Sequence, residues 1–466
     1  MSYPAYPEYK DSGAEWLGEV PVHWEVKPLK RAIASVESGT SVNAADVPAV
    51  QGGKGVLKTS CVYRGWFDWR ENKTVNQEDL GRVSCPVRKN TLIVSRMNTP
   101  ELVGSAGLVV EAPDGIFLPD RLWQVSMQER CSPKYYYYFT RSPAYRDQVK
   151  IACAGTSSSM QNLGQDEFRA IWHPSPPLHE QQIIATFLDH ETARIDALVE
   201  EQQRLIALLK EKRQAVISHA VTKGLDPDMP MRDSGVEWLG EVPEHWPQVR
   251  LKHVVSQIID TEHKTVHFRE DGEYLVVRTS NVRNGELILE GAKYTDACGY
   301  NEWTNRGRPQ PGDVLFTREA PAGEACLVPH GVDLCLGQRM VLFIVKKARM
   351  DSQFLIYSIY AGLSSEFIES LSQGSTVVHF NMSDICNIPL FEPSLEEQES
   401  ICCHLRMHLD CFDRLIEEAS GSVELMKERR SALVSAAVTG KIDVRGWQPP
   451  AGSALATGEA TQMEAV

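Results

Sequence analysis

Two long segments of the chain carry apolar residues at spacings that alternate between four and three. In residues 178–226 seven of eleven positions in this series are apolar, and eight of eleven, counting alanine, are apolar in the segment 395–445. The pattern predicts two long helices, each with one narrow apolar seam. We expect the two helices to pair with each other as a coiled coil; the alternative is that each lies on its own domain. The seam residues are Ile184, Leu188, Ile195, Leu198, Leu205, Leu209 and Val216, then Ile401, Leu405, Phe412, Leu415, Met426 and Leu433.

The chain is an internal duplication. Residues 11–30 and 233–252 are identical at 14 of 20 positions, with the shared pattern DSG-x-EWLGE-x-P-x-HW. Residues 178–226 align without gaps on 395–443, with 19 of 49 positions identical. Between these pairs only scattered residues match, notably Arg96 with Arg318 and Arg121 with Arg339. The order is therefore a cap segment, a divergent domain and a long helix, and then the same three parts again.

The divergent stretches predict mixed strands and helices. Residues 56–62 and 91–94 read as strands in the first half, as do 274–279 and 341–345 in the second. Shorter helices are expected at 134–149 and 352–371. The predicted fold class is α+β: two α/β domains separated by two long helices, in a pseudo-two-fold internal repeat. The predicted divisions are 1–177, 178–226, 227–394, 395–445 and a disordered tail at 446–466, where Ala, Gly, Pro and Glu dominate.

Composition indicates an ordinary soluble protein with an uneven charge. The net charge is −14, which is unfavourable for contact with nucleic acid. Residues 27–173, however, hold 19 Lys+Arg against 14 Asp+Glu, a balance of +5, whereas residues 250–392 hold 14 against 18, a balance of −4. The N-terminus lacks the features of a signal peptide, and no stretch approaches the roughly 20 apolar residues of a membrane helix. We expect a cytoplasmic protein without a membrane contact.

The sequence offers no convincing catalytic constellation. It contains no G-x-x-x-x-G-K-[ST] loop, no G-x-S-x-G motif, and no G-x-G-x-x-G after a strand. Eleven cysteines without C-x-x-C spacing argue against a disulfide framework and against zinc. Cys402, Cys403, His404 and His408 lie close together on one predicted helix, but we interpret them as helical surface and packing residues. We therefore expect neither a catalytic site nor a metal site in this chain.

Other residues suit nucleic acid. Arginine can pair with guanine, asparagine with adenine, and small hydroxyl side chains with phosphate oxygens. The two hydroxyl-rich loops, beginning at Gly155 and Gly374, occur at matching places in the two halves. The candidate DNA-binding residues are Lys58, Arg64, Trp66, Arg96, Asn98, Arg121, Ser157, Ser158, Gln161 and Asn162 in the first half, and Arg278, Asn281, Arg318, Arg339, Ser375, Thr376 and Asn381 in the second.

The combination of motifs resembles the specificity subunit of type I restriction-modification systems. The resemblance rests on the repeated cap, on the P-x-x-x-x-EQ entries to both long helices, and on the EK-R-x-A-x-I-S-x-A-V-T-K-G helix end. It implies two target-recognition domains that each read half of a split double-stranded DNA sequence, with antiparallel helices as a ruler. It also implies two methyltransferase (modification) subunits and restriction motor-nuclease subunits as partners. S-adenosylmethionine, ATP and Mg would then bind to those partners.

The resemblance leaves two other classes to weigh. One is a structural adapter that joins two proteins without reading DNA. The other is a fused methyltransferase or nuclease, against which the missing donor-binding and amino-methylation motifs argue. The two recognition domains differ so strongly that we expect an asymmetric target, and the acidic balance of the second domain requires a local DNA-binding face or a partner that completes it.

Overall fold

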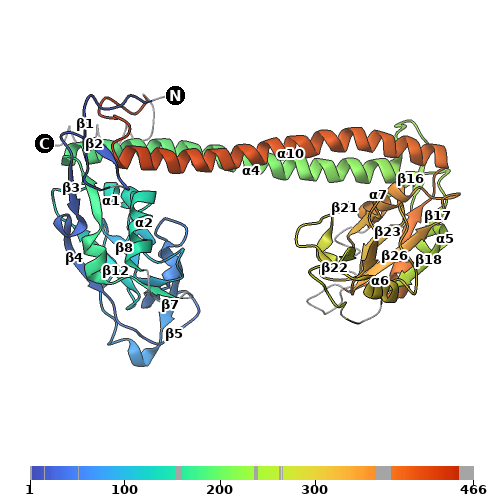
Figure 1. Cartoon of the computed structure of the whole chain (residues 1–466), viewed down its shortest axis with the longest axis horizontal. Coiled ribbons are helices and arrows are strands. Elements are labelled where there is room, and N and C mark those ends of the chain that lie inside the picture. The colour runs from blue at the N-terminus through green and yellow to red at the C-terminus, as the bar shows by residue number, and fades with distance from the viewer. Residues whose placement is uncertain are drawn as a thin grey trace. The chain divides into compact units, whose positions relative to one another are not determined.

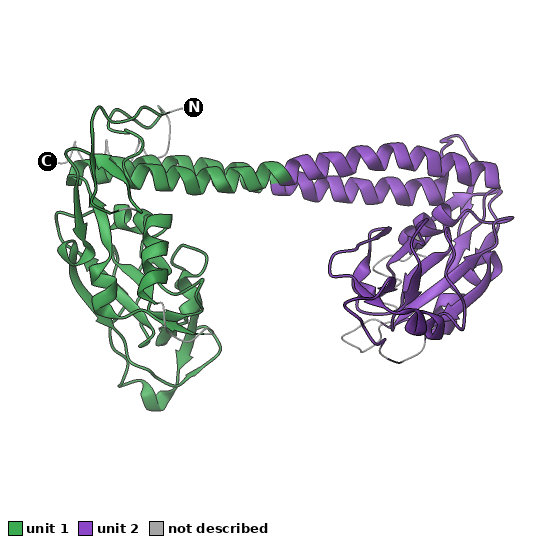
Figure 2. Ribbon diagram, in the orientation of Figure 1, with its two compact units in different colours: residues 1–202, 421–466 green, residues 203–420 purple. Residues whose placement is uncertain are grey.

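The chain forms two compact units (Figures 1 and 2). Unit 1 comprises residues 1–202 and 421–466, and unit 2 comprises residues 203–420. The structure is a computed structural model, and it describes residues 3–14, 16–50, 52–153, 160–235, 240–261, 264, 266–362 and 379–450. Each unit combines a divergent domain with parts of both long helices, whereas the sequence suggested a division into separate consecutive segments. None of the described helices has the length and apolar character required to cross a membrane.

The two predicted long helices are present as α4 (Leu178–Lys223) and α10 (Leu395–Val438). Both end earlier than expected because a glycine follows closely. Gly224 and Gly440 have φ values of +74° and +76°, a conformation that side-chain-bearing residues adopt only with strain.

Within each unit the two helices run antiparallel. In unit 1 the first turns of α4 share a core with the last turns of α10, through Ile184, Leu188 and Val438. In unit 2 the end of α4 shares a core with the start of α10, through Ile217 and Leu405.

The same ion pair recurs in both units. Arg430 Nε lies 2.7 Å from Asp196 Oδ1 in unit 1, and Arg213 Nε lies 2.8 Å from Asp413 Oδ1 in unit 2. Asp196 aligns with Asp413, and Arg213 with Arg430, in the sequence repeat. The helices therefore meet in the same register in each unit.

The predicted seam is correct at some positions and wrong at others. Ile184, Leu188, Ile195, Ile401 and Leu405 are buried, and Leu209, Val216, Phe412, Met426 and Leu433 are half-buried. Leu198, Leu205 and Leu415 are 45%, 42% and 43% exposed, so these three assignments are wrong. The residues that follow them, Val199, Ile206 and Ile416, are the half-buried ones. Two series of positions with spacings of three and four can be drawn along the helix, and they coincide at every seventh residue. Because leucines lie directly beside the true seam, the series that passes through them also looked apolar.

Unit 1 contains two four-stranded sheets, with the orders β10-β8-β12-β4 and β11-β6-β7-β5. Two-stranded pairs β1-β2, β3-β14 and β9-β13 surround them. The strands are β1 (Tyr9–Asp11), β2 (Glu19–Pro21), β3 (Glu25–Pro28), β4 (Ile33–Ser38), β5 (Ala44–Ala45), β6 (Gly55–Leu57), β7 (Asn72–Val75), β8 (Leu92–Ser95), β9 (Met97–Asn98), β10 (Ala106–Leu108), β11 (Ile116–Phe117), β12 (Leu122–Met127), β13 (Gln161–Asn162) and β14 (Trp172–Ser175).

The helix expected at 134–149 is two helices, α1 (Pro133–Phe139) and α2 (Pro143–Ala152). Ser132 and Ser142 cap them, and each serine precedes a proline that is suited to the first helical position. The strand expected at 56–62 ends at Leu57 and continues as the 3-10 turn η2 (Thr59–Val62). The remaining turns and helix are η1 (Leu29–Arg31), η3 (Gln77–Asp79) and α3 (Gln165–Ala170).

Unit 2 repeats the central sheet in the order β18-β26-β23-β24 and adds a three-stranded sheet β22-β19-β25. The strands are β15 (Met231–Asp233), β16 (Glu241–Pro243), β17 (Gln248–Arg250), β18 (Val255–Asp260), β19 (Tyr274–Val277), β20 (Val282–Arg283), β21 (Glu286–Leu287), β22 (Lys293–Thr295), β23 (Val314–Thr317), β24 (Ala325–Leu327), β25 (Leu334–Leu336), β26 (Met340–Val345) and β27 (Pro389–Phe391). The helices and turn are α5 (Leu251–Val254), η4 (Thr279–Asn281), α6 (Ala297–Trp303), α7 (Ser352–Gly362) and α9 (Met382–Cys386).

The repeated HW and EQ motifs meet in three dimensions. In unit 1 the carboxylate of Glu180 accepts hydrogen bonds from Trp24 Nε1 at 3.1 Å and from the Tyr6 hydroxyl at 2.5 Å. In unit 2 Glu397 accepts from Trp246 Nε1 at 3.0 Å. Both tryptophans are fully buried, so each needs an acceptor for its indole N–H. These hydrogen bonds therefore fix the first cap segment to the start of α4 and the second cap segment to the start of α10.

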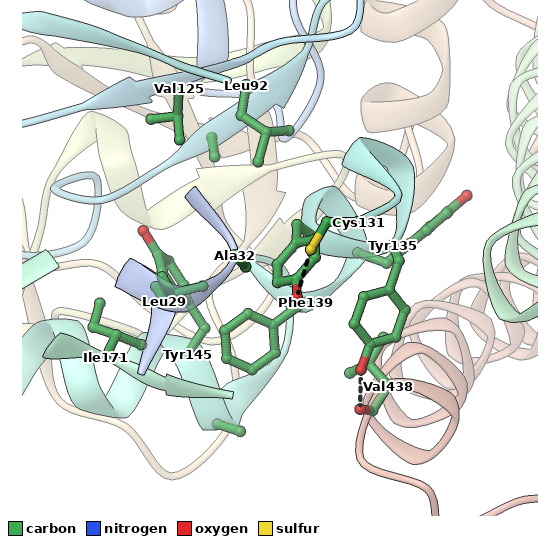
Figure 3. Packing of buried hydrophobic residues seen from close by; sticks show 14 of the residues in the cluster. Leu29, Ala32, Leu92, Val125, Cys131, Tyr135, Phe139, Tyr145, Ile171 and Val438 are labelled. Carbon is green, nitrogen blue, oxygen red and sulfur yellow. Dashed lines mark hydrogen bonds between the residues drawn. The ribbon is translucent and has the colours of Figure 1, made fainter. Parts of the chain in front are cut away.

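The end of α10 and the residues that follow it up to Trp447 pack within unit 1. The hydroxyl of Tyr135 lies 3.0 Å from the carbonyl oxygens of Pro174 and Val438, which fastens α1 to the end of α10 (Figure 3). The ring of Trp447 lies 5.5 Å from that of Phe187 on α4. The sequence placed Trp447 in a disordered tail, but its aromatic ring is part of the packing; residues 451–466 lie outside the described residues.

Candidate nucleic-acid interface

The matching arginines Arg96 and Arg318 occupy the same backbone position in their units. The Arg96 amide donates to the Arg121 carbonyl at 3.1 Å, and the Arg96 carbonyl accepts from the Leu163 amide at 2.8 Å. In unit 2 the Arg318 amide donates to the Arg339 carbonyl at 2.9 Å, and the Arg318 carbonyl accepts from the Phe380 amide at 3.0 Å. We call this arrangement the arginine junction: residues 96–98, 121 and 161–163 in unit 1, and residues 318–320, 339 and 379–381 in unit 2.

The junction of unit 1 presents cations and hydrogen-bonding groups at the surface. Arg121 and Asn162 are exposed, and Gln161 is half-buried opposite Asn98 in the β9-β13 ladder. The Arg96 guanidinium lies 5.8 Å from the centre of the Trp123 ring. A guanidinium group can donate hydrogen bonds to a phosphate or to the edge of a base.

Arg64 and Trp66 form a second exposed feature of unit 1. Trp66 is 51% exposed, and the Arg64 guanidinium lies 5.9 Å from its ring centre. Trp66 also borders a groove of about 540 Å³ that is lined by Arg141, Lys427 and Arg430, with Asp196 as the acid. Arg64 and Trp66 are therefore both near the surface, and the groove beside Trp66 includes two cations of α10 that are paired with acids, Arg430 with Asp196 and Lys427 with Glu424.

Asn98 is not available as a base reader. It is 7% exposed, and its amide donates to the Tyr63 hydroxyl at 2.9 Å and to Ser95 Oγ at 3.2 Å. Lys58 forms an ion pair at 2.9 Å with the exposed Asp46, whose carboxylate also lies 3.4 Å from Lys73. Asn98 holds the junction against η2, a structural role that its sequence position did not reveal.

Two candidates in unit 2, Arg318 and Asn281, are also structural. Arg318 is 6% exposed and donates to Asp260 Oδ2 at 2.7 Å and to the Phe380 carbonyl at 3.1 Å. Asn281 is fully buried, and its amide donates to the Ile288 carbonyl at 2.9 Å. Arg278 donates to the Gly291 carbonyl at 2.7 Å. Arg318 and Asn281 stabilise the domain because their side-chain donors are used internally. Arg278 is half-buried and its Nε has no hydrogen-bond partner, so its role as a DNA contact stays a prediction.

Two unit 2 candidates remain at the surface. The side chain of Arg339 is 51% exposed and lies 2.6 Å from Glu319. Asn381 is exposed and precedes the first turn of α9. The remaining candidates, Ser157, Ser158, Ser375 and Thr376, lie outside the described residues.

Sequence reasoning missed Tyr63, which contacts the junction of unit 1, and Glu319 and His379 in the junction of unit 2. The Tyr63 hydroxyl connects Thr59 Oγ1, at 2.7 Å, to Asn98. Glu319 lies between Arg339 and His379, whose Nδ1 is 3.3 Å away. Tyr63 is adjacent to Arg64 in the sequence, and Glu319 follows Arg318, so adjacency to the chosen arginines was the available signal.

Among the described residues, no three His, Cys, Asp or Glu side chains gather as a group that could hold a metal ion. The described residues form no disulfide, and burial raises the pKa of the Cys61 and Cys335 thiols.

The fold and its repeated junction define a duplicated α+β protein in which the two halves share one backbone arrangement around a pair of arginines. Two stretches, residues 21–207 and 243–421, match the family model of the type I restriction modification DNA specificity domain. The chain therefore belongs to the family of type I restriction-modification DNA specificity subunits.

Individual relatives cover most of the chain. It is 22% identical over 439 residues to the putative type I restriction enzyme MjaX specificity subunit of Methanocaldococcus jannaschii, covering 92% of this chain and 96% of that protein. It is 34% identical over 323 residues to the StySPI specificity subunit of Salmonella potsdam, covering 67% and 66%. A chain from a structure of complex assembly in a type I R-M system has the same fold, with a TM-score of 0.67 at 16% identity, covering 91% of this chain and 99% of that one.

Proposed function

We propose that this chain is the DNA-reading subunit of a type I restriction-modification complex. The divergent domain of unit 1 reads one half of a split, asymmetric sequence, and that of unit 2 reads the other half. The observation that carries the proposal is the arginine junction, which the two units share in backbone hydrogen bonds and not in surrounding side chains. Two domains with the same backbone arrangement and different surface side chains are suited to recognising two different DNA sequences.

The long helices act as the ruler in this proposal. Their antiparallel pairing would form a coiled coil, and its length would fix the spacer between the two half-sites. Support comes from the recurring register, in which Asp196–Arg430 and Asp413–Arg213 are equivalent pairs. A helix of 46 residues is roughly 69 Å long at 1.5 Å per residue, which is ample for a ruler on the scale of DNA turns.

The proposal assigns the chemistry to partner subunits. Two methyltransferase subunits would dock on this chain and bind S-adenosylmethionine, and motor-nuclease subunits would bind ATP and Mg for restriction. This chain would supply sequence choice and a docking frame. The alternative adapter function predicts the same assembly without any dependence on DNA sequence.

The test is genome-wide methylation mapping in cells that express this chain with its methyltransferase. We expect a split, asymmetric motif that appears only with this subunit. Replacing residues 31–173 with the same region of another family member should change one half of the motif and leave the other half and the spacer intact.

The matched control replaces the corresponding region of unit 2, which should change only the other half. An assembled, active complex without a subunit-dependent motif would favour the adapter function. A single replacement that altered both halves would contradict the assignment of one half-site to each unit.

A further inference from the structure

The two central sheets have the same register, which identifies equivalent side-chain positions. Trp123 pairs with Ser38 across β12-β4, and Val341 pairs with Asp260 across β26-β18. On the other side of each strand, Trp123 pairs with Val94 and Val341 pairs with Phe316. Val94 lies two residues before Arg96, and Phe316 lies two residues before Arg318. Ser38 in unit 1 therefore stands where unit 2 has Asp260.

A second equivalent pair follows the junction arginines directly. Met97 pairs with Asn162 in the β9-β13 ladder, and Glu319 pairs with His379 in a bridge of the same kind. Met97 in unit 1 therefore stands where unit 2 has Glu319. At both positions unit 2 has a carboxylate and unit 1 has an uncharged side chain.

The two carboxylates of unit 2 neutralise the two junction arginines. Asp260 Oδ2 lies 2.7 Å from Arg318 Nη1, and Glu319 Oε1 lies 2.6 Å from Arg339 Nε. Arginines paired in this way attract an external phosphate weakly, because the field of the carboxylate opposes that of the guanidinium. Arg318 is in addition buried, so its role is to hold the junction together.

The charges of the equivalent arginines of unit 1 are not balanced by a neighbouring carboxylate among the described residues. The half-buried Arg96 lies over Trp123, whose ring supports a cation without neutralising it, and its Nε is buried without a hydrogen-bond partner. Arg121 is exposed. Within the part of the chain that the structure describes, no carboxylate pairs with either of them.

We propose that Arg96 and Arg121 form a phosphate-binding pair in unit 1, and that the identity of residues 38 and 97 decides whether such a pair exists. This inference rests on the proposed function, since the phosphates are those of target DNA. Unit 1 then supplies electrostatic anchoring through its junction, whereas the junction of unit 2 contributes little to it. On this proposal the divergent domain of unit 2 can be acidic overall, because the phosphate contacts are made by unit 1.

The experiment installs the carboxylates of unit 2 in unit 1. The variants are Ser38→Asp with Met97→Glu, and as a neutral control of matched size Ser38→Asn with Met97→Gln. Each full chain is assembled with its methyltransferase, and the affinity for a duplex containing the mapped motif is measured between 50 and 200 mM salt at pH 8. Each phosphate contact contributes about 0.9 to the slope of log affinity against log salt, so the acidic variant should lose about 1.8 and the neutral control nothing.

A reverse variant tests the same idea in unit 2. Glu319→Gln should leave Arg339 unneutralised and increase the slope by about 0.9. Thermal unfolding of every variant confirms that the complexes compared are folded, and the methylated motif should stay the same because phosphate contacts carry no base information.

Two outcomes would overturn the inference in distinguishable ways. If the acidic and neutral variants share the wild-type slope while motif-specific binding persists, Arg96 and Arg121 are not phosphate ligands and the proposed function stands. If the wild-type complex binds every duplex without salt dependence or motif preference, both the inference and the proposed function fail.

Discussion

The main-chain amide of Arg318 donates to the carbonyl oxygen of Arg339 at 2.9 Å, although the two residues are 21 positions apart in the sequence. Arg96 and Arg121 make the same bond at 3.1 Å in a domain of different sequence. The backbone of the junction is thus retained while its charges change, since Asp260 and Glu319 have no acidic equivalents in unit 1. The same backbone arrangement therefore carries a different set of charges in each unit.

Asp260→Asn should destabilise unit 2. The change leaves the buried guanidinium of Arg318 without its counter-ion, and a buried charge that loses its partner is costly. We expect a loss of about 2 kcal/mol, since the Asp260 side chain is 25% exposed and water can compensate in part. Hydrogen exchange of peptides from β18 and β23 in the full chain measures the loss. The exposed Asp271→Asn is the control and should leave exchange unchanged; equal protection in both variants would contradict a structural role for the pair.

Glu180→Ala should cost more than Glu397→Ala, although both occupy the same repeated motif. Glu180 is 1% exposed and serves Tyr6, His23 and Trp24, whereas the Glu397 side chain is 25% exposed and serves two donors. Donors left buried without an acceptor cost about 3 kcal/mol in unit 1 and about 1 kcal/mol in unit 2. Hydrogen exchange of the cap segments reports each loss separately. Equal losses would show that burial does not set the strength of this contact.

The secondary structure of the repeats was predictable because it is encoded locally. The spacing of apolar residues sets the two long helices, and no proline interrupts them. The phase of the seam was not predictable, since Leu198 and Val199 are adjacent and both apolar, and only packing against α10 selects Val199. The repeat itself supplied the junction arginines, because Arg96 and Arg318 match within otherwise divergent sequence.

The chemistry around the junction depends on contacts that are distant in the sequence. Arg318 is neutralised by Asp260, 58 residues earlier, and Asn98 is held by Tyr63, 35 residues earlier. No periodicity indicates that these residues meet, so buried structural groups were predicted as base readers. Arg121 and Trp66 are exposed, and their role as DNA-binding residues stays a prediction.

The observed seam predicts opposite effects at two adjacent residues of α4. Val199→Asp places a carboxylate in the half-buried seam and should destabilise the helix pair of unit 1 by roughly 3 kcal/mol. Leu198→Asp adds the same group to a position that is 45% exposed and should change stability by less than about 0.5 kcal/mol. Urea unfolding followed by circular dichroism compares the two. A larger loss for Leu198→Asp would restore the seam expected from the sequence.

Unit 1 should lose stability in acid because of His173 on β14. The side chain is fully buried, its Nε2 lies 2.8 Å from the Tyr136 hydroxyl, and burial lowers its pKa to about 3. An unfolded histidine binds a proton below about pH 6.5, so the contribution is complete above that pH and is lost as the pH falls towards 3. At pH 5 the loss is about 2 kcal/mol.

His173→Gln retains a group that can accept from Tyr136 but cannot be protonated in this pH range. The variant is less stable than the wild type at pH 7, and we expect the difference between them to shrink by about 2 kcal/mol between pH 7 and pH 5. Urea unfolding at a series of pH values, resolved by hydrogen exchange of β14 and α1 peptides, gives this difference. The exposed His219→Gln on α4 lies in unit 2 and should leave the pH dependence of unit 1 as it is in the wild type. If His173→Gln keeps the full pH dependence, protonation of His173 in the unfolded chain is not its source, and carboxylates paired in the folded unit become the explanation.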